Sequence, residues 1–198
     1  MVEEREQRLL SLLARNGFPS LDSARILEVG CGTGSWLCSF ARWGASPENI
    51  CGVDLLPDRI AQARKFCPAG VQLQCQDATR LDFPDASFDL VLQSTVFTSI
   101  LHSGLKQMLA GEMVRLARPG GLILWYDFLV NNPWNPDVRG VREAEIRTLF
   151  AGCRIYLERL TLAPPLGRRI APISPPLYRA MSRIKLLCTH YLGIIFRP

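Results

Sequence analysis

The order of hydrophobic and polar residues along this chain changes between two patterns, one with the period of a helix and one typical of buried strands. Near the N-terminus, four leucines punctuate a polar stretch that ends at Asn16 and Gly17, which predicts an amphipathic helix over 3–15. The run 26–29 is short and apolar and enters a cluster of glycines, which predicts a buried strand. The chain therefore begins with a helix and then enters a sheet.

The rest of the chain continues this alternation. Four further helices are predicted at 35–43, 57–66, 105–117 and 143–150. Six further strands are predicted at 50–54, 71–76, 88–93, 122–128, 153–162 and 189–196, with a turn over 118–121. Strands that alternate with helices at this spacing indicate an α/β fold with a mainly parallel sheet and helices on both faces.

One segment, 163–187, lies between the last two predicted strands. Its five prolines are expected to limit regular structure, and apolar residues then recur at helical spacing from Leu177 to Leu187 among basic residues. A strand still follows the segment, and it is too short to bury a core of its own. We therefore expect an insertion within a single domain that spans 1–198, and not a linker.

Length and composition agree with this architecture. The 198 residues, 48% of them hydrophobic, are enough for one domain with a buried core. No apolar run approaches the ~20 residues that span a bilayer, and the acidic, polar N-terminus does not resemble a signal peptide, so we expect a cytoplasmic protein. Seven cysteines without a Cys-x-x-Cys pair, and only two histidines, argue for reduced thiols and against a metal site.

Charge is distributed unevenly along the chain. Residues 1–138 hold 12 basic and 15 acidic side chains, a net charge of −3, whereas residues 139–198 hold 11 basic and 3 acidic side chains, a net charge of +8. A basic last third is compatible with an anionic acceptor, with an anionic surface or with a solvated basic face, and these alternatives stay open.

The candidate chemistry begins where the first strand ends, in the run from Glu28 to Gly34 that contains Gly30 and Gly32. Glycines let the backbone turn tightly and let a ligand approach the main chain closely. The run follows a parallel strand and precedes a helix, which is where open α/β sheets bind ligands. A dinucleotide fold would place its third glycine one residue later, so the spacing disfavours a nicotinamide oxidoreductase.

This run resembles the first motif of the class I S-adenosylmethionine-dependent methyltransferases, and four further segments match in order. They are Asp54 after the second strand, Gln76-Asp77-Ala78 after the third, the entry to the fourth strand over 83–91, and the turn over 116–121. The entry to the fourth strand is similar to the ubiquinone-methyltransferase-like branch, type 11. The resemblance covers about half of the chain. It implies a Rossmann-like, seven-stranded, mostly parallel sheet whose last strand is antiparallel.

The resemblance also implies S-adenosyl-L-methionine as the cofactor. Glu28 would organise the glycine loop and the methionine end of the cofactor, beneath which Gly30 and Gly32 pass. Asp54 and Leu55 would hold the ribose and the purine edge, because a carboxylate at this position can accept hydrogen bonds from the ribose hydroxyls. The other expected cofactor contacts are Cys31, Gly34, Asp77, Ala78 and Gln93. For Asp77, a cap of a turn or helix is the alternative role.

The acceptor is expected to enter between the loops after the fourth and fifth strands, 94–99 and 126–139. Positioning can supply much of the rate of methyl transfer, and a general base helps a hydroxyl acceptor. His102 and Asp127 are the candidate catalytic residues; the alternatives are a surface or capping role for His102 and a loop anchor for Asp127. The insertion 163–187 is expected to form a lid beside this pocket, and its basic amphipathic part packs on the domain or rests on an anionic membrane.

These features favour a methyltransferase that acts on a small molecule. O-methylation of a sugar, a lipid-linked glycan or a natural-product hydroxyl is the leading hypothesis, and the basic residues suit an anionic acceptor. The segment after the fourth strand lacks the Asn/Asp-Pro-Pro-Tyr/Phe pattern of many enzymes that methylate the amino groups of bases, which disfavours nucleic acid. The alternatives are an RNA or protein methyltransferase, or a non-catalytic cofactor-binding partner subunit.

Overall fold

The computed structural model describes residues 2–198 of the chain, with side chains described from Glu4 onward. In this part of the chain, seven strands form one sheet in the order β3-β2-β1-β4-β5-β7-β6. The strands are β1 (Ile26–Val29), β2 (Ile50–Asp54), β3 (Gln72–Cys75), β4 (Phe88–Ser94), β5 (Ala117–Phe128), β6 (Arg154–Leu162) and β7 (Cys188–Phe196). β7 runs antiparallel to β5 and β6, and the other pairs are parallel. The predicted Rossmann-like sheet is confirmed.

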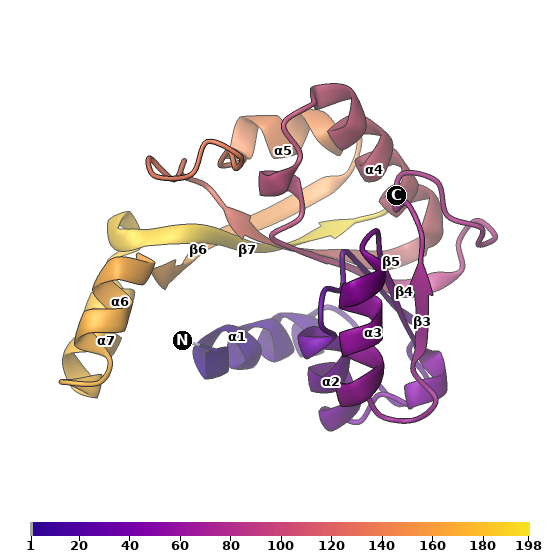
Figure 1. Ribbon diagram of the computed structural model, residues 1–198, viewed down its shortest axis with the longest axis horizontal. Coiled ribbons are helices and arrows are strands. Elements are labelled where there is room, and N and C mark those ends of the chain that lie inside the picture. The colour runs from indigo at the N-terminus through magenta and orange to yellow at the C-terminus, as the bar shows by residue number, and fades with distance from the viewer. Residues whose placement is uncertain (1) are drawn as a thin grey trace.

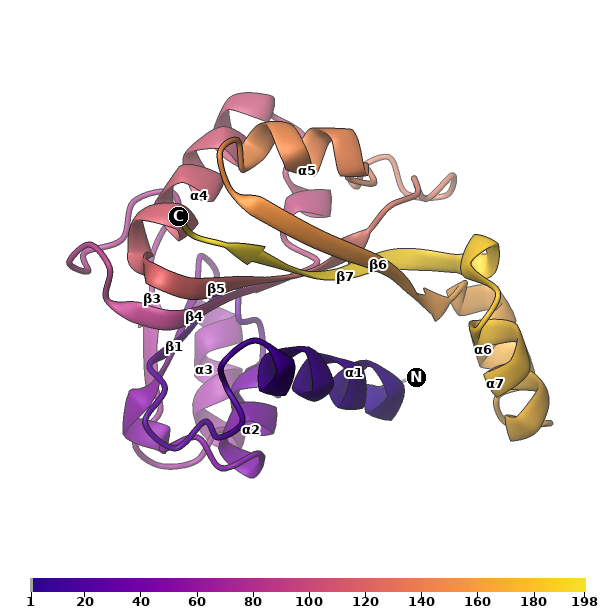
Figure 2. The same ribbon diagram turned by 180° about the vertical axis from the view of Figure 1, so that it is seen from behind.

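Helices lie on both faces of the sheet (Figure 1). The α-helices are α1 (Val2–Arg15), α2 (Ser35–Arg42), α3 (Pro57–Phe66), α4 (Ser103–Leu116), α5 (Glu143–Leu149), α6 (Pro164–Ile170) and α7 (Pro175–Ser182). The chain also contains three short 3-10 helices in its described part, which are η1 (Pro47–Asn49), η2 (Phe97–Ser99) and η3 (Lys185–Leu187). α1, α2 and α3 cover one face and α4 and α5 the other, while α6 and α7 stand at the end of β6 and β7 (Figure 2).

The sheet buries both of its faces because apolar residues follow one another along the central strands. In β5, Leu122 and Leu124 point into the core beneath α1 and α2, whereas Ile123 and Trp125 pack with Met113 of α4 in the second core. Successive side chains of a strand point to opposite faces, so an unbroken apolar run serves two helical layers at once.

Most predicted elements agree with the structure to within two residues at each end. The exception is the predicted turn over 118–121, which lies inside β5 as an irregularity. There the pairing with β4 shifts from Phe88 opposite Ala117 to Leu90 opposite Leu122. The extra residues bulge out of the ladder, and Gly120 supplies the positive φ of 74° that the bulge requires.

The expectation that prolines limit regular structure in the segment 163–187 was wrong. Two of them, Pro164 and Pro165, begin α6, and two others, Pro175 and Pro176, begin α7. Proline fits the first turn of a helix because its missing N–H would have no partner there and its fixed φ is already helical. The prolines therefore start a pair of short helices.

The loops that matter for function emerge at one edge of the sheet. The glycine loop follows β1, Thr95 follows β4, and Leu129 follows β5, all at the carboxyl ends of parallel strands. Because β7 is antiparallel to both β5 and β6, the segment 163–187 leaves and re-enters the sheet at the same edge. No helix in the described chain is both long and apolar enough to cross a membrane.

Candidate functional site

The glycine loop connects β1 to α2 through three residues with positive φ. At Gly32, φ is 55° and a Cβ would meet no atom within 4 Å, so the main chain there is open to a ligand. At Gly30, φ is 66° and a Cβ would collide with the side chain of Val96, which follows β4. The glycines therefore serve two different needs, a ligand's access at Gly32 and contact with the neighbouring loop at Gly30.

Asp54, at the end of β2, fastens this loop. Its carboxylate accepts a hydrogen bond of 2.8 Å from the N–H of Gly32 and one of 3.0 Å from the N–H of Leu56. Its neighbour Leu55 leaves 66% of its surface exposed. Both residues lie where the resemblance expects the ribose and the purine edge, and their contacts with the cofactor stay predictions.

Two buried polar groups near the loop lack a partner among the described residues. One oxygen of Glu28 in β1 accepts no hydrogen bond, and the amide nitrogen of Gln93 in β4 donates none. The other end of the Gln93 amide accepts a 3.2 Å hydrogen bond from the N–H of Val96. Burial raises the pKa of Glu28 well above its ordinary value, and the nearby Asp54 adds to this effect. An unpartnered buried acceptor and donor are costly, and they suit a ligand that carries an ammonium and a carboxylate group.

Arg5 of α1 lies close to the same place, which the sequence analysis missed. Its guanidinium stacks 4.2 Å from the ring centre of Trp36 and 4.9 Å from that of Tyr126. Its charge opposes the rise in the pKa of Glu28. The leucines of the first helix carry its amphipathic pattern. Nothing in that pattern indicates that an arginine on the polar side of the helix lies over two aromatic rings.

His190 of β7 extends this cluster away from the loop. Its ring stacks on Tyr126 with 4.8 Å between ring centres, and the Tyr126 hydroxyl shares a 2.9 Å hydrogen bond with Thr161. Burial, helped by the charge of Arg5, lowers the pKa of His190 to about 4. His190 is therefore neutral at physiological pH and acts as a packed ring.

The remaining predicted cofactor residues lie around the loop in different surroundings. Asp77, after β3, is exposed and accepts hydrogen bonds from the N–H and hydroxyl of Thr79 at 2.9 and 2.8 Å. This is the turn-capping geometry that was the alternative for Asp77. Ala78 is half-buried against the second core. Cys31 is buried, and burial raises the pKa of its thiol, so only its main chain is available for chemistry.

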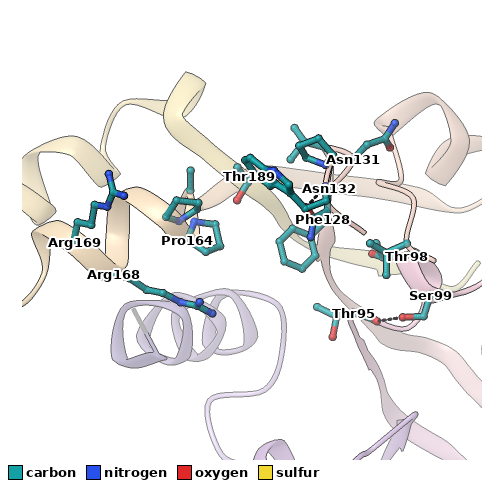
Figure 3. A pocket seen from close by; sticks show the side chains of 16 residues that line it. Thr95, Thr98, Ser99, Phe128, Asn131, Asn132, Pro164, Arg168, Arg169 and Thr189 are labelled. Carbon is teal, nitrogen blue, oxygen red and sulfur yellow. Dashed lines mark hydrogen bonds between the residues drawn. The ribbon is translucent and has the colours of Figure 1, made fainter. Parts of the chain in front are cut away.

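A cavity of about 750 Å³ opens beside the loops that follow β4 and β5 (Figure 3). Four segments that are distant in the sequence line it. They contribute Thr95, Thr98 and Ser99; Phe128, Val130, Asn131, Asn132, Pro133, Trp134 and Val138; Ala163, Pro164, Pro165, Arg168 and Arg169; and Thr189. This volume is ample for a drug-sized molecule. The cavity therefore lies where the sequence analysis placed the acceptor.

Asp127 stands behind this cavity, fully buried at the end of β5. Its carboxylate accepts a 2.8 Å hydrogen bond from the N–H of Phe128 and a 3.2 Å one from the N–H of Thr98. Burial raises its pKa to about 7, although these N–H groups oppose the rise. Asp127 is not among the residues that line the cavity, so the geometry favours an anchor for the loop after β4. Its catalytic role stays a prediction.

His102 is exposed and caps the N-terminus of α4. Its Nδ1 accepts a 3.3 Å hydrogen bond from the N–H of Leu105, and it is not among the residues that line the cavity. The structure thus shows the capping geometry that was the alternative for His102, and its role as a base stays a prediction. No cluster of potential metal-ligating side chains occurs among the described residues.

Comparison with known proteins adds to this picture. The family model of a methyltransferase domain matches residues 26–121. The chain is 38% identical over 108 residues to a fatty-acid O-methyltransferase of Mycolicibacterium smegmatis, a match that covers 54% of this chain and 38% of that protein. It is 32% identical over 114 residues to a tRNA N(3)-cytidine methyltransferase of Gallus gallus, covering 54% of this chain and 30% of that protein. The chain thus spans less than two thirds of the length of these curated relatives.

The fold itself is shared more widely than the sequence. The crystal structure of an S-adenosylmethionine-dependent methyltransferase from Mesorhizobium loti superposes with a TM-score of 0.67 at 18% identity, and the match covers 96% of this chain and 97% of that one. At this identity the likeness establishes a common fold. The family match covers the residues that carry the predicted motifs, and a methyltransferase domain of this kind implies S-adenosyl-L-methionine as the cofactor.

Proposed function

Since residues 26–121 belong to the methyltransferase domain family and the described chain has the class I methyltransferase fold, we propose that the protein transfers a methyl group from S-adenosyl-L-methionine to a hydroxyl of a small molecule. The cofactor supplies an activated methyl group on a sulfonium. The protein's own part is to hold the cofactor on the glycine loop and the acceptor in the neighbouring cavity. The proposed acceptor is a sugar, a lipid-linked glycan or a natural product.

The observation that carries this proposal is the position of the cavity. Thr95 and Thr98 line it, while Val96 between them contacts the glycine loop at Gly30. One short loop therefore faces the acceptor on one side and the cofactor on the other. Holding two reactants in this way turns a bimolecular reaction into an effectively unimolecular one, which supplies a large part of the barrier reduction.

The cavity's polar groups suit a hydroxyl-bearing acceptor with an anionic group. Thr95, Thr98 and Ser99 line the cavity with hydroxyl groups, and the hydroxyl of Thr98 has no partner among the described residues. Arg168 and Arg169 line the opposite wall from α6, and Figure 3 shows them far from Thr98. A fatty-acid O-methyltransferase is among the relatives, which supports an acceptor with an anionic and an apolar part.

Transfer of a labelled methyl group from the cofactor to a panel of hydroxylated acceptors, with and without an anionic group, tests this function. We expect label in anionic acceptors, and we expect the double variant Arg168→Ala, Arg169→Ala to lose most of that activity with unchanged cofactor affinity. A matched control is Arg59→Ala, Arg64→Ala, a pair of exposed arginines on α3. Failure to bind the cofactor, or equal activity of both double variants, would contradict the proposal.

RNA is a second candidate acceptor. The net charge of +8 on residues 139–198 and the similarity to a tRNA methyltransferase favour it. The same labelled assay with transfer RNA separates the two, because label in RNA and not in small acceptors would make the cavity's lining irrelevant to the reaction.

A further inference from the structure

The pair of helices α6 and α7 presents one face to the protein and one to solvent. On the packed face, Tyr178 and Ser182 of α7 are buried, and the Tyr178 hydroxyl donates a 3.2 Å hydrogen bond to Glu4 of α1. Figures 1 and 2 both show the pair at one extremity of the molecule, beyond the ends of β6 and β7. Its outer face has no protein layer over it in the described chain.

That outer face carries a stripe of apolar residues. Leu177 and Ala180 are three residues apart on α7, the spacing of one side of a helix, and Ile173 and Ile184 lie just before and just after that helix. All four are exposed, Ile173 to 84%. Leu186 follows in η3 and is 85% exposed. Exposed apolar residues that gather on one element, unlike residues scattered singly, mark a contact with a partner or a membrane.

Basic residues flank the stripe. Arg168, Arg169, Arg179 and Arg183 are exposed, and their side chains make no ion pair or hydrogen bond with any described residue. Lys185 is also exposed, with its ammonium donating to the carbonyl of Arg159. No acidic residue occurs in the chain after Glu158. On the packed side, Glu4 lines a groove together with Arg179 and Arg183.

The same helices border the cavity. Arg168 and Arg169 of α6 line it, and so does Trp134, which is 85% exposed. A surface laid against the outer face of α6 and α7 would therefore meet the rim of the cavity as well. Aromatic and basic side chains are the residues that accumulate where proteins meet the headgroup layer of a bilayer.

We propose that α6, α7 and η3 form a docking surface for an anionic phospholipid bilayer, with Ile173, Leu177, Ala180, Ile184 and Leu186 entering the headgroup layer. Unpaired arginines attract anionic headgroups, whereas a protein partner with an apolar patch would not require them. The docking is independent of the methyl-transfer reaction, and it would place the cavity rim at the membrane surface.

Vesicle flotation tests the docking surface. The full chain is mixed with vesicles of phosphatidylcholine alone or with phosphatidylglycerol added, at low and high salt. We expect binding to the anionic vesicles that weakens at high salt, and little binding to phosphatidylcholine alone. Absence of binding to anionic vesicles at low salt would overturn the proposal.

Two double variants separate the apolar from the electrostatic contribution to vesicle binding. Ile173→Asp, Leu186→Asp should weaken vesicle binding by roughly tenfold or more, and Arg179→Gln, Arg183→Gln by several-fold. Because these side chains are exposed, circular dichroism should show unchanged folding. The matched control is Phe66→Asp, which changes an equally apolar residue, 70% exposed, at the end of α3.

Three results count against the docking surface. Equal vesicle binding by the aspartate double variant and by Phe66→Asp would show that the stripe does not enter the bilayer. Binding that ignores salt and headgroup charge would remove the role of the arginines. A dimer in sedimentation that Ile173→Asp, Leu186→Asp dissociates, with vesicle binding unaffected, would assign the stripe to a second copy of this chain.

Discussion

Two buried carboxylates, one beside the glycine loop and one behind the cavity, are held in opposite ways. Glu28 in β1 has one oxygen without a partner among the described residues, close to the glycine loop. Asp127 in β5 accepts hydrogen bonds from the N–H groups of Phe128 and Thr98. Burial raises the pKa of both groups. Glu28 thus has an oxygen that can still accept a hydrogen bond from a ligand. Asp127 instead uses its oxygens to accept hydrogen bonds from the protein's own main chain.

The contrast teaches how the two halves of the site differ. On the cofactor side, an unsatisfied acceptor is maintained at a cost in stability, which is a common feature of binding sites before the ligand arrives. On the acceptor side, the satisfied Asp127 fixes the loop that carries Thr98, so the cavity wall is shaped by the backbone. We therefore expect substitutions on the first side to change affinity and those on the second to change stability.

The largest effect should come from Asp54→Ala, which removes both the predicted ribose contact and the hydrogen bond to Gly32. A charge-assisted pair of hydrogen bonds to two hydroxyls is strong, so we expect cofactor binding to weaken by ~2–3 kcal/mol in calorimetry with a chelator present. The control is Asp85→Ala, whose exposed carboxylate pairs with Arg115 in the described chain. Equal affinities for Asp54→Ala and the control would place the ribose elsewhere.

Glu28→Gln should have the next largest effect and should separate affinity from stability. Without a charge to offer to an ammonium group, we expect the cofactor to bind about 1–2 kcal/mol more weakly. The free energy of unfolding without ligand should not fall, because the glutamine avoids burying an ionisable group whose pKa is raised by desolvation. If Glu28→Gln lost stability and kept its affinity for the cofactor, Glu28 would be the carboxylate that stabilises the fold, contrary to our expectation. Calorimetry and urea titration give the two quantities.

The two halves also differ in how far sequence could predict them. The candidate cofactor residues lie near the ends of three successive strands. The spacing of the glycines and the position of Asp54 depend on the local backbone, so they can be recognised in the sequence. In the cavity, Arg168 and Thr189 join the loops after β4 and β5 only because β7 enters the sheet between β5 and β6. A sequence pattern with a period of two or 3.6 residues carries no record of such distant meetings.

Two particular residues show the same limit. Arg5 was missed because its place over Trp36 and Tyr126 depends on how α1 packs, not on its neighbours in sequence. The prolines of the insertion were misjudged for a local reason, since their effect depends on whether they stand in the first turn of a helix or later. The fold, the cofactor and the segments that border the cavity were predictable, and the individual side chains that line it were not.

Asp127→Asn should have a moderate effect that depends on pH. The pKa of Asp127 is near 3.8 when unfolded and about 7 when folded, so between pH 4 and 7 the folded protein keeps a proton that the unfolded chain releases. Ionisation of Asp127 thus lowers the stability of the wild type as pH rises through this window. Relative to wild type, we expect Asp127→Asn to gain about 1 kcal/mol or more from pH 4 to pH 7.

Parallel urea titrations of wild type and Asp127→Asn at four or more pH values check this expectation. Other titrating groups such as Glu28 and His190 are present in both proteins, so their contributions cancel in the difference. A difference in stability that stays constant with pH would mean that Asp127 is already ionised in the folded protein at acid pH, and that its N–H partners outweigh its burial.

The smallest effect should come from His102→Ala, and it decides between a cap and a base. The imidazole accepts one hydrogen bond of 3.3 Å at the start of α4 and is exposed, so its removal should lower the free energy of unfolding by about 0.5–1 kcal/mol. Transfer of the labelled methyl group to an acceptor should stay within about twofold of wild type, because removal of a general base costs roughly 100-fold or more. His102→Asn restores a capping side chain without an imidazole and should recover the lost stability. If both variants lose turnover by that larger factor with unchanged cofactor affinity, His102 reaches the acceptor. In that case His102 would serve both as the cap of α4 and as a catalytic group for the acceptor.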